Sequence, residues 1–281
     1  MNYHDEYQQS IEQPEIFWRK QAKQIKWYEF PETILSQDEH GFYRWFAGGK
    51  LNTAYLALDV HIEEGRGDQL ALVYDSPAAN MQQKFTYAEL RDTVAKFAGC
   101  LRNLGVEKGD RVIIYMPMVA EAVIAMLACA RLGAVHSVVF GGFAPNELAV
   151  RIDDAKPKVL VTGSCGIEFT KIIEYKPLVD KALEVSKFPP ENIVVLQRPQ
   201  AKATMQSGRD HDWNELMSQA SPADPVSLDA TDPLYILYTS GTTGLPKGVV
   251  RDNGGHAVAL KYSMKAVYNT DPGDVYWAGS D

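Results

Sequence analysis

Short apolar runs alternate with amphipathic stretches between residues 86 and 196. Thr86 and Glu89 have the spacing of a capping box, in which each side chain satisfies a free backbone amide at the start of a helix. Apolar residues then recur every three or four positions as far as Gly105, which predicts one amphipathic helix that ends at a glycine. The apolar positions of this helix are Leu90, Val94, Phe97, Leu101 and Leu104.

The apolar runs have the length and the β-branched content of buried strands. In chain order they are RVIIYM, AVHSVVF, KVLVT and NIVVLQ. The stretches between them predict helices at VAEAVIAMLACARLG, APNELAVRIDDA and residues 177–186. Strands that alternate with helices pair in parallel through right-handed crossovers. We therefore predict an α/β fold with a largely parallel sheet that has helices on both faces, and ligands at the carboxyl ends of its strands.

The remaining segments have weaker patterns. Residues 1–65 are aromatic with little periodicity, so we predict an irregular segment that wraps onto the body formed by residues 66–281. Residues 198–232 are polar and contain three prolines, which indicates an exposed linker. PLYILYT then predicts a strand that runs into a glycine-rich stretch, and GVVRDN predicts a second strand after it.

Composition narrows the possible functions. The chain has 281 residues, and 46% of them are hydrophobic. Its net charge of −8 disfavours a non-specific nucleic-acid binder. The three cysteines form no C-x-x-C pair and the six histidines have no metal-ligand spacing, so we expect no disulfide framework and no protein-held metal. No signal-peptide pattern or membrane-length apolar run is visible, and we expect a cytoplasmic protein with small-molecule partners.

The glycine-rich stretch TSGTTGLPKG, residues 239–248, has the chemistry of a phosphate cradle. Glycines allow successive amides to point at one anion, hydroxyls add donors, and Lys247 adds a positive charge. A structural turn is the alternative. A Walker A loop is disfavoured, because Pro246 and Gly248 occupy the positions of its second glycine and its Ser/Thr.

This stretch resembles the phosphate-loop signature of the AMP-forming acyl-CoA synthetases, which belong to the adenylate-forming superfamily. Three further tracts are similar to the acetyl- and propionyl-CoA synthetase branch: GGKLNTAYLALDVH, ARLGAVHSVVFGGFAPNELAVRI and GDVYWAGSD. VVRDNGGHAVAL is most similar to propionyl-CoA synthetases. The resemblance implies an acetyl-CoA synthetase-type N-terminal segment in residues 1–65 and the front of an adenylating domain in residues 66–281.

The resemblance also implies an activity. The family joins a carboxylic acid to coenzyme A through an acyl-adenylate, with ATP, Mg²⁺ and coenzyme A as substrates or cofactors; propionate is favoured here and acetate is next. The residues that it assigns to the ATP phosphates are Thr239, Ser240, Gly241, Thr242, Thr243, Gly244 and Lys247.

For coenzyme A the resemblance points to Phe140, Gly141, Gly142 and Lys171. Relatives that activate acetate carry two arginines where this chain has Glu168 and Lys171. A lysine can contact the 3′-phosphate of coenzyme A without a bidentate fork, and Glu168 would repel that phosphate.

The acyl pocket and the catalytic residues are expected beyond Asp281, so we expect a ligase fragment that is inactive alone. The alternative is a non-catalytic nucleotide- or coenzyme-binding module that retains the loop.

Residues outside these motifs have structural interpretations. We expect His136 to be a buried, hydrogen-bonded imidazole and His256 to pack beside the loop. Asp153 and Asp154 are expected to be solvated at a helix end. Cys100 and Cys129 fit buried helix positions. Cys165, between two glycines, is expected to be more exposed.

Overall fold

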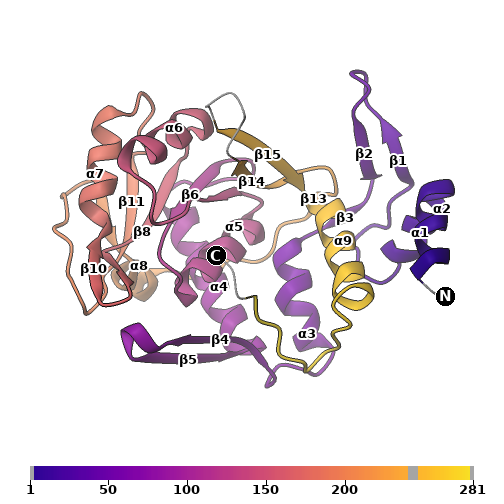
Figure 1. Cartoon of the computed structure of the whole chain (residues 1–281), viewed down its shortest axis with the longest axis horizontal. Helices are drawn as coiled ribbons and strands as arrows, with labels where there is room; N and C mark the ends of the chain where they lie inside the picture. The colour runs from indigo at the N-terminus through magenta and orange to yellow at the C-terminus, as the bar shows by residue number, and fades with distance from the viewer. Residues whose placement is uncertain (1–2, 240–245, 279–281) are drawn as a thin grey trace.

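The computed structural model describes residues 3–239 and 246–278, and its centre is a seven-stranded sheet (Figure 1). In spatial order the strands are β12 (Asp210–Asp212), β11 (Asn192–Leu196), β8 (Val159–Gly163), β6 (Arg111–Tyr115), β7 (Val135–Val138), β14 (Pro233–Thr239) and β15 (Lys247–Asp252). Neighbouring strands from β12 to β14 are parallel, and β15 is antiparallel to β14. The predicted α/β class is confirmed.

Alternate residues of the central strands face two helical layers. Val112 and Ile114 of β6 belong to a core with α4 (Tyr87–Asn103), α5 (Ala120–Leu132) and α8 (Trp213–Gln219). Ile113 and Tyr115 belong to a second core with α6 (Pro145–Ala155) and α7 (Tyr175–Val185). Because side chains of a strand alternate between faces, an entirely apolar strand needs cover on both sides.

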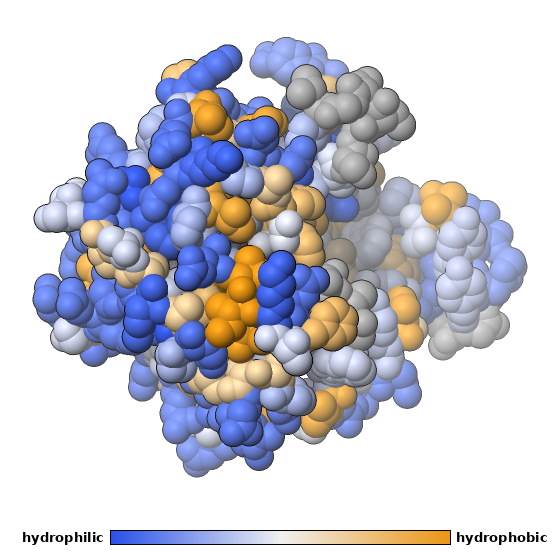
Figure 2. Space-filling view, turned by 60° about the vertical axis from the view of Figure 1, so that its left-hand side comes forward, coloured by the Kyte–Doolittle hydropathy of each residue, from blue (hydrophilic) through white to orange (hydrophobic). Residues whose placement is uncertain are grey.

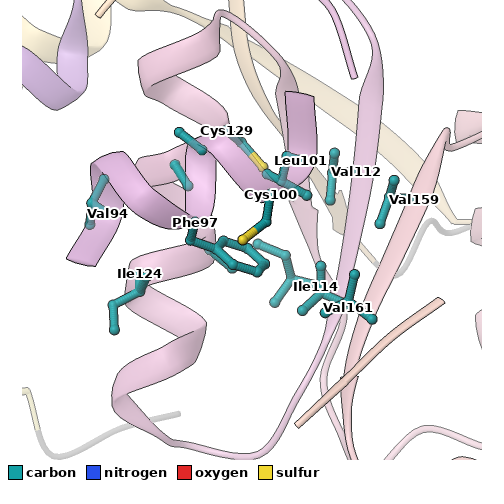
Figure 3. Packing of buried hydrophobic residues seen from close by; sticks show 14 of the residues in the cluster. Val94, Phe97, Cys100, Leu101, Val112, Ile114, Ile124, Cys129, Val159 and Val161 are labelled. Carbon is teal, nitrogen blue, oxygen red and sulfur yellow. The ribbon is translucent and has the colours of Figure 1, made fainter. Parts of the chain in front are cut away.

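Figure 3 shows the first core, in which Phe97, Cys100 and Leu101 of α4 lie over the apolar side chains of β6 and β8. The capping box at the start of α4 is confirmed: Glu89 N donates to Thr86 Oγ1 at 3.2 Å, and Thr86 N donates to Glu89 Oε2 at 2.9 Å. Gly105 follows the helix with a φ of +81°, which relieves the backbone strain that a side chain would cause there.

The N-terminal segment docks on the sheet body, as expected, but it is more regular than its weak periodicity indicated. Its elements are α1 (Tyr3–Glu12), α2 (Pro14–Ala22), β1 (Thr33–Gln37), β2 (Tyr43–Ala47), β3 (Lys50–Leu51), the π-helical turn η1 (Tyr55–Asp59) and α3 (Val60–Glu63). Figure 1 shows α1, α2 and the β1–β2 hairpin at the opposite end of the molecule from α7. Edge-to-face contacts of Trp18 with Trp45 and Tyr262 attach this end to α9 (Asn253–Ala266).

Buried polar contacts fix the segment onto α5. Asn52 Nδ2 donates to the carbonyl oxygens of Ala130, Arg131 and Val226 at 3.1, 3.1 and 2.9 Å. The Arg131 guanidinium also makes two hydrogen bonds to the Asp59 carboxylate, at 2.7 and 3.1 Å.

The prediction of an exposed linker at residues 198–232 was wrong. This part of the chain contains β12, α8 and β13 (Leu228–Asp229), and β13 pairs with β3. Trp213 is buried and stacks on Phe97 with ring centroids 3.8 Å apart. A few apolar side chains among many polar ones were enough to hold the segment against the core.

Two hairpins complete the fold. β4 (Leu70–Ser76) and β5 (Met81–Thr86) are joined through the short 3₁₀ turn η2 (Pro77–Ala79). β9 (Cys165–Glu168) and β10 (Lys171–Glu174) form the second hairpin, directly after β8. Figure 2 brings the α7 side of the molecule forward and shows a mainly hydrophilic surface with isolated apolar areas. Within residues 3–239 and 246–278, no helix is long and apolar enough to cross a membrane.

Candidate functional site

The candidate phosphate loop connects β14 to β15. Thr239 and Lys247 are partners across the antiparallel ladder, and both are exposed. Ser240, Gly241, Thr242, Thr243 and Gly244 lie outside the described residues. Because β14 is parallel to β7, its end at Thr239 lies at the carboxyl edge of the sheet, where ligands bind in open α/β sheets.

Tyr238 fixes the stem of this loop. Its ring lies across Gly248 on β15, where an added Cβ would come within 3.2 Å of Tyr238 Cε1 and 3.1 Å of Ile236 Cγ2. The Tyr238 hydroxyl donates to Asp154 Oδ2 at 2.6 Å. Burial, followed by this hydrogen bond, raises the pKa of Tyr238.

Asp154 is exposed, as expected, and Asp153 is partly buried, but both carboxylates also have hydrogen-bond partners from distant parts of the chain. Asp154 accepts from Tyr238, and Asp153 Oδ1 accepts from the backbone amides of Lys187 and Phe188 at 2.7 and 3.1 Å. Their position in the sequence, at a polar helix end, gave no sign of these distant partners.

The candidate coenzyme A turn follows β7 at the same edge. Phe140 is 53% exposed, and its ring packs edge-on against Phe143 with centroids 5.6 Å apart. An added Cβ would come within 2.3 Å of the Tyr175 hydroxyl at Gly141 and within 2.5 Å of the Phe140 ring at Gly142. A side chain at either glycine would therefore displace one of these aromatic rings.

The candidate charged pair lies on the β9–β10 hairpin. Glu168 and Lys171 are cross-strand partners and both are exposed, with Phe169 at the tip, 88% exposed and at a φ of +53°. Gly166 on the same hairpin also faces Tyr175, where an added Cβ would lie 2.7 Å from the ring. The structure thus brings the Phe140–Phe143 turn and the hairpin together on the two sides of Tyr175, a residue that the sequence patterns did not single out.

A separate cavity lies away from the loop. It measures about 490 Å³ and is lined by Trp18, Trp45, Tyr235, Arg251 and His256, among others. Tyr235 pairs with Arg251 at one end of the β14–β15 ladder, whereas Thr239 pairs with Lys247 at the other. The cavity is therefore separate from the candidate phosphate site.

Two histidines lie near this cavity. His256 Nδ1 is 3.3 Å from the Tyr235 hydroxyl, so this histidine packs near the strand that leads to the loop. His136 is buried, as expected, but within the described part of the chain its Nδ1 has no hydrogen-bond partner, which corrects the expectation of a satisfied imidazole. Burial lowers the pKa of His136 to about 4.

All three cysteines are buried, so Cys165 does not have the greater exposure expected from its glycine neighbours. Burial raises the pKa of Cys100 to about 11, which leaves it a thiol at neutral pH. Among the described residues no group of three or more His, Cys, Asp or Glu side chains could hold a metal ion.

Comparisons with known proteins identify the family and match the fold. A family model described as AMP-binding enzyme matches residues 60–281, and a model described as acetyl-coenzyme A synthetase N-terminus matches residues 3–57. The acetoacetyl-CoA synthetase from Streptomyces lividans superposes with a TM-score of 0.87 at 28% identity, over 98% of this chain and 42% of that one.

Several curated relatives align along almost the whole chain. An uncharacterized protein of Pseudomonas aeruginosa is 60% identical over 100% of this chain and 45% of its own length. The human mitochondrial acyl-CoA synthetase short-chain family member 3 is 50% identical over 99% of this chain and 41% of its own. The acetyl-coenzyme A synthetase of Yersinia pestis is 44% identical over 99% of this chain and 43% of its own. The chain thus spans less than half the length of these relatives, and it belongs to the AMP-binding enzyme family, with relatives among the short-chain acyl-CoA and acetyl-CoA synthetases.

Proposed function

We propose that this chain acts within an AMP-forming ligase that joins a short-chain carboxylic acid to coenzyme A. In the first step a carboxylate oxygen attacks the α-phosphorus of ATP, and the bond to the bridging oxygen breaks to release pyrophosphate. In the second step the thiolate sulfur of coenzyme A attacks the acyl carbon of the adenylate, and AMP leaves with the electrons of the broken C–O bond.

The observation that carries this proposal is the register that places Lys247 opposite Thr239 at the carboxyl edge of the sheet. A lysine at the base of a glycine-, serine- and threonine-rich loop supplies a compact charge next to hydrogen-bond donors. We propose that Thr239, Ser240, Gly241, Thr242, Thr243, Gly244 and Lys247 bind the β- and γ-phosphates of ATP–Mg²⁺. Contacts with these phosphates stabilise the negative charge that develops on the leaving pyrophosphate.

The turn and hairpin around Tyr175 are the proposed coenzyme A region. Phe140, Gly141, Gly142 and Lys171 are assigned to it because they lie at the sheet edge that also carries the loop. Exposed Lys171 offers one ammonium to the 3′-phosphate, while exposed Glu168 opposes that phosphate from the facing strand.

Propionate is the favoured acid and acetate the next. The support is the similarity of VVRDNGGHAVAL to propionyl-CoA synthetases, together with 50% identity to the human short-chain acyl-CoA synthetase against 44% to the Yersinia pestis acetyl-coenzyme A synthetase.

The test is acid-dependent exchange of labelled pyrophosphate into ATP by the full-length protein, with propionate, acetate and acetoacetate compared at matched concentrations. Exchange that requires the acid, with the highest kcat/KM for propionate, supports the proposal. ATP–Mg²⁺ binding without exchange for any of the three acids would instead favour a non-catalytic nucleotide-binding module.

A further inference from the structure

Arg151 of α6 lies between two aromatic rings that belong to the two candidate substrate segments. Its Cζ is 4.6 Å from the centroid of the Phe143 ring and 5.6 Å from the centroid of the Tyr238 ring. Phe143 ends the candidate coenzyme A turn, and Tyr238 precedes the candidate phosphate loop. A planar guanidinium can interact with an aromatic ring on each side, so one side chain contacts both segments.

The guanidinium is held firmly in this place. The Arg151 side chain is only 5% exposed, and its Nη1 donates to the carbonyl oxygen of Glu147 at 2.6 Å and to Glu147 Oε2 at 2.9 Å. A buried cation is costly without partners, and here the partners are one carboxylate, one carbonyl and two ring faces.

Each ring is in turn attached to the body of the domain. The Tyr238 hydroxyl donates to Asp154, three residues after Arg151 on the same helix. The carbonyl oxygen of Phe143 accepts from the Tyr115 hydroxyl of β6 at 2.9 Å, and the Phe143 ring contacts exposed Phe140. Contacts therefore run from Phe140 through Phe143 and Arg151 to Tyr238. Figure 1 shows α6 at the same edge of the sheet as the beginning of β15.

We propose that Arg151 is a positioning residue that holds the stem of the phosphate loop and the coenzyme A turn in place at the same time. It acts through Tyr238 on one side and Phe143 on the other, without contacting either substrate. This inference rests on the proposed function for the identity of the two ligands. It makes a specific claim: changes at either ring affect one ligand, whereas changes at Arg151 affect both.

The experiment measures the affinities of ATP–Mg²⁺ and coenzyme A by isothermal titration calorimetry on the full-length protein. Tyr238→Leu should raise the Kd for ATP–Mg²⁺ alone, Phe143→Leu should raise the Kd for coenzyme A alone, and Arg151→Met should raise both, each by about five- to tenfold. The double variant R151M/Y238L should bind ATP–Mg²⁺ no more weakly than Tyr238→Leu, because both changes remove the same contact. Arg151→Lys keeps the positive charge but lacks the planar guanidinium group, so it should restore the affinities only in part.

The control is Phe188→Leu, which removes another cation–aromatic contact near the end of the same helix. In that contact Lys156 Nζ lies 4.4 Å from the centroid of the Phe188 ring. This variant should leave both affinities unchanged.

Two outcomes would overturn the inference. In the first, Arg151→Met lowers thermal stability but changes neither affinity more than Phe188→Leu does. In the second, the effects of Arg151→Met and Tyr238→Leu on the affinity for ATP–Mg²⁺ add. If Arg151→Met does not fold, the separate effects of Tyr238→Leu and Phe143→Leu, with Arg151→Lys weakening both ligands, decide the matter. Failure of acid-dependent exchange in a protein that binds both ligands would overturn the proposed function and leave these binding results intact.

Discussion

Thr239 and Lys247 are opposite each other on β14 and β15, so the chain leaves the sheet and returns to it at one point. Opposite residues on an antiparallel pair project their side chains on the same face. The hydroxyl of Thr239 and the ammonium of Lys247 therefore belong to a single face of the ladder, at the edge where the proposed ATP phosphates bind.

Replacing Lys247 by alanine should weaken ATP–Mg²⁺ use in the first half-reaction. Loss of one charge-assisted contact costs about 1.5–3 kcal/mol, which appears as a lower kcat/KM for ATP in pyrophosphate exchange. Arg251→Ala removes the other exposed cation of β15, at the far end of the ladder, and is the matched control. Exchange kinetics of Lys247→Ala that are unchanged over a range of ATP concentrations would remove Lys247 from the site.

Glu168→Arg should lower the KM for coenzyme A and leave adenylation unchanged. The substitution replaces a repelling carboxylate by a guanidinium directly opposite Lys171, where the two cations can share one phosphate. The measurement compares coenzyme A with its 3′-dephospho form in the complete reaction. An equal response of the two forms would show that the hairpin does not recognise the 3′-phosphate.

Breaking the ion pair between Arg131 and Asp59 should strongly destabilise the attachment of the N-terminal segment. The two side chains are 4% and 12% exposed, and removal of one partner leaves the other charge buried. Arg131→Met should lower the free energy of unfolding by about 3–5 kcal/mol in urea denaturation. Lys265→Met breaks the exposed pair with Asp271 and should cost at most about 1 kcal/mol; equal losses in the two variants would contradict this account.

His136 should make folding stability fall as the pH falls from about 6.5 to 4. Its folded-state pKa lies below the unfolded value, so in this window the unfolded chain binds more protons and acidification favours unfolding. The full effect is at most about 3 kcal/mol, and His256 nearby, whose pKa is also lowered by burial, acts in the same direction. The difference in unfolding free energy between wild type and His136→Gln, measured across this range, isolates the effect. His40→Gln, at an exposed histidine, is the control. A His136→Gln protein whose stability has the same pH dependence as the wild type would refute the role of His136.

The 281 residues by themselves should make no acyl-CoA. They span only 41–45% of the length of the curated relatives. Orientation of a bound carboxylate against the α-phosphate is worth about 7–11 kcal/mol, and a chain that does not bind the acid loses this contribution to catalysis. The assay is propionate- and acetate-dependent pyrophosphate release from ATP–Mg²⁺ by the purified chain, beside the full-length protein. Turnover by the chain alone at the full-length rate would place the catalytic groups within these residues.

Local patterns in the sequence were sufficient to predict the other strands of the central sheet and several of the helices that cover it, but not β12 or α8. The three- and four-residue spacing from Leu90 to Leu101 predicted α4, and the apolar run at residues 111–115 predicted a strand covered on both faces, because these patterns depend only on helix and strand geometry. The chemistry of residues 239–248 likewise identified the candidate phosphate loop without a structure. The parallel pairing of β14 with β7 then placed Thr239, the first residue of this stretch, at the carboxyl edge of the sheet.

Partners that are distant in the sequence were decided by the tertiary structure alone. Trp213 looked like part of a linker until α8 brought it against Phe97, and nothing near Asp154 in the sequence indicated that Tyr238 of β14 donates a hydrogen bond to it. Gly141 and Gly166 are 25 residues apart, and only the folded chain shows that both make room for one ring, that of Tyr175. The physical reason is that local periodicity determines which side of an element is buried, whereas the order of strands in the sheet determines which side chains from remote segments meet there.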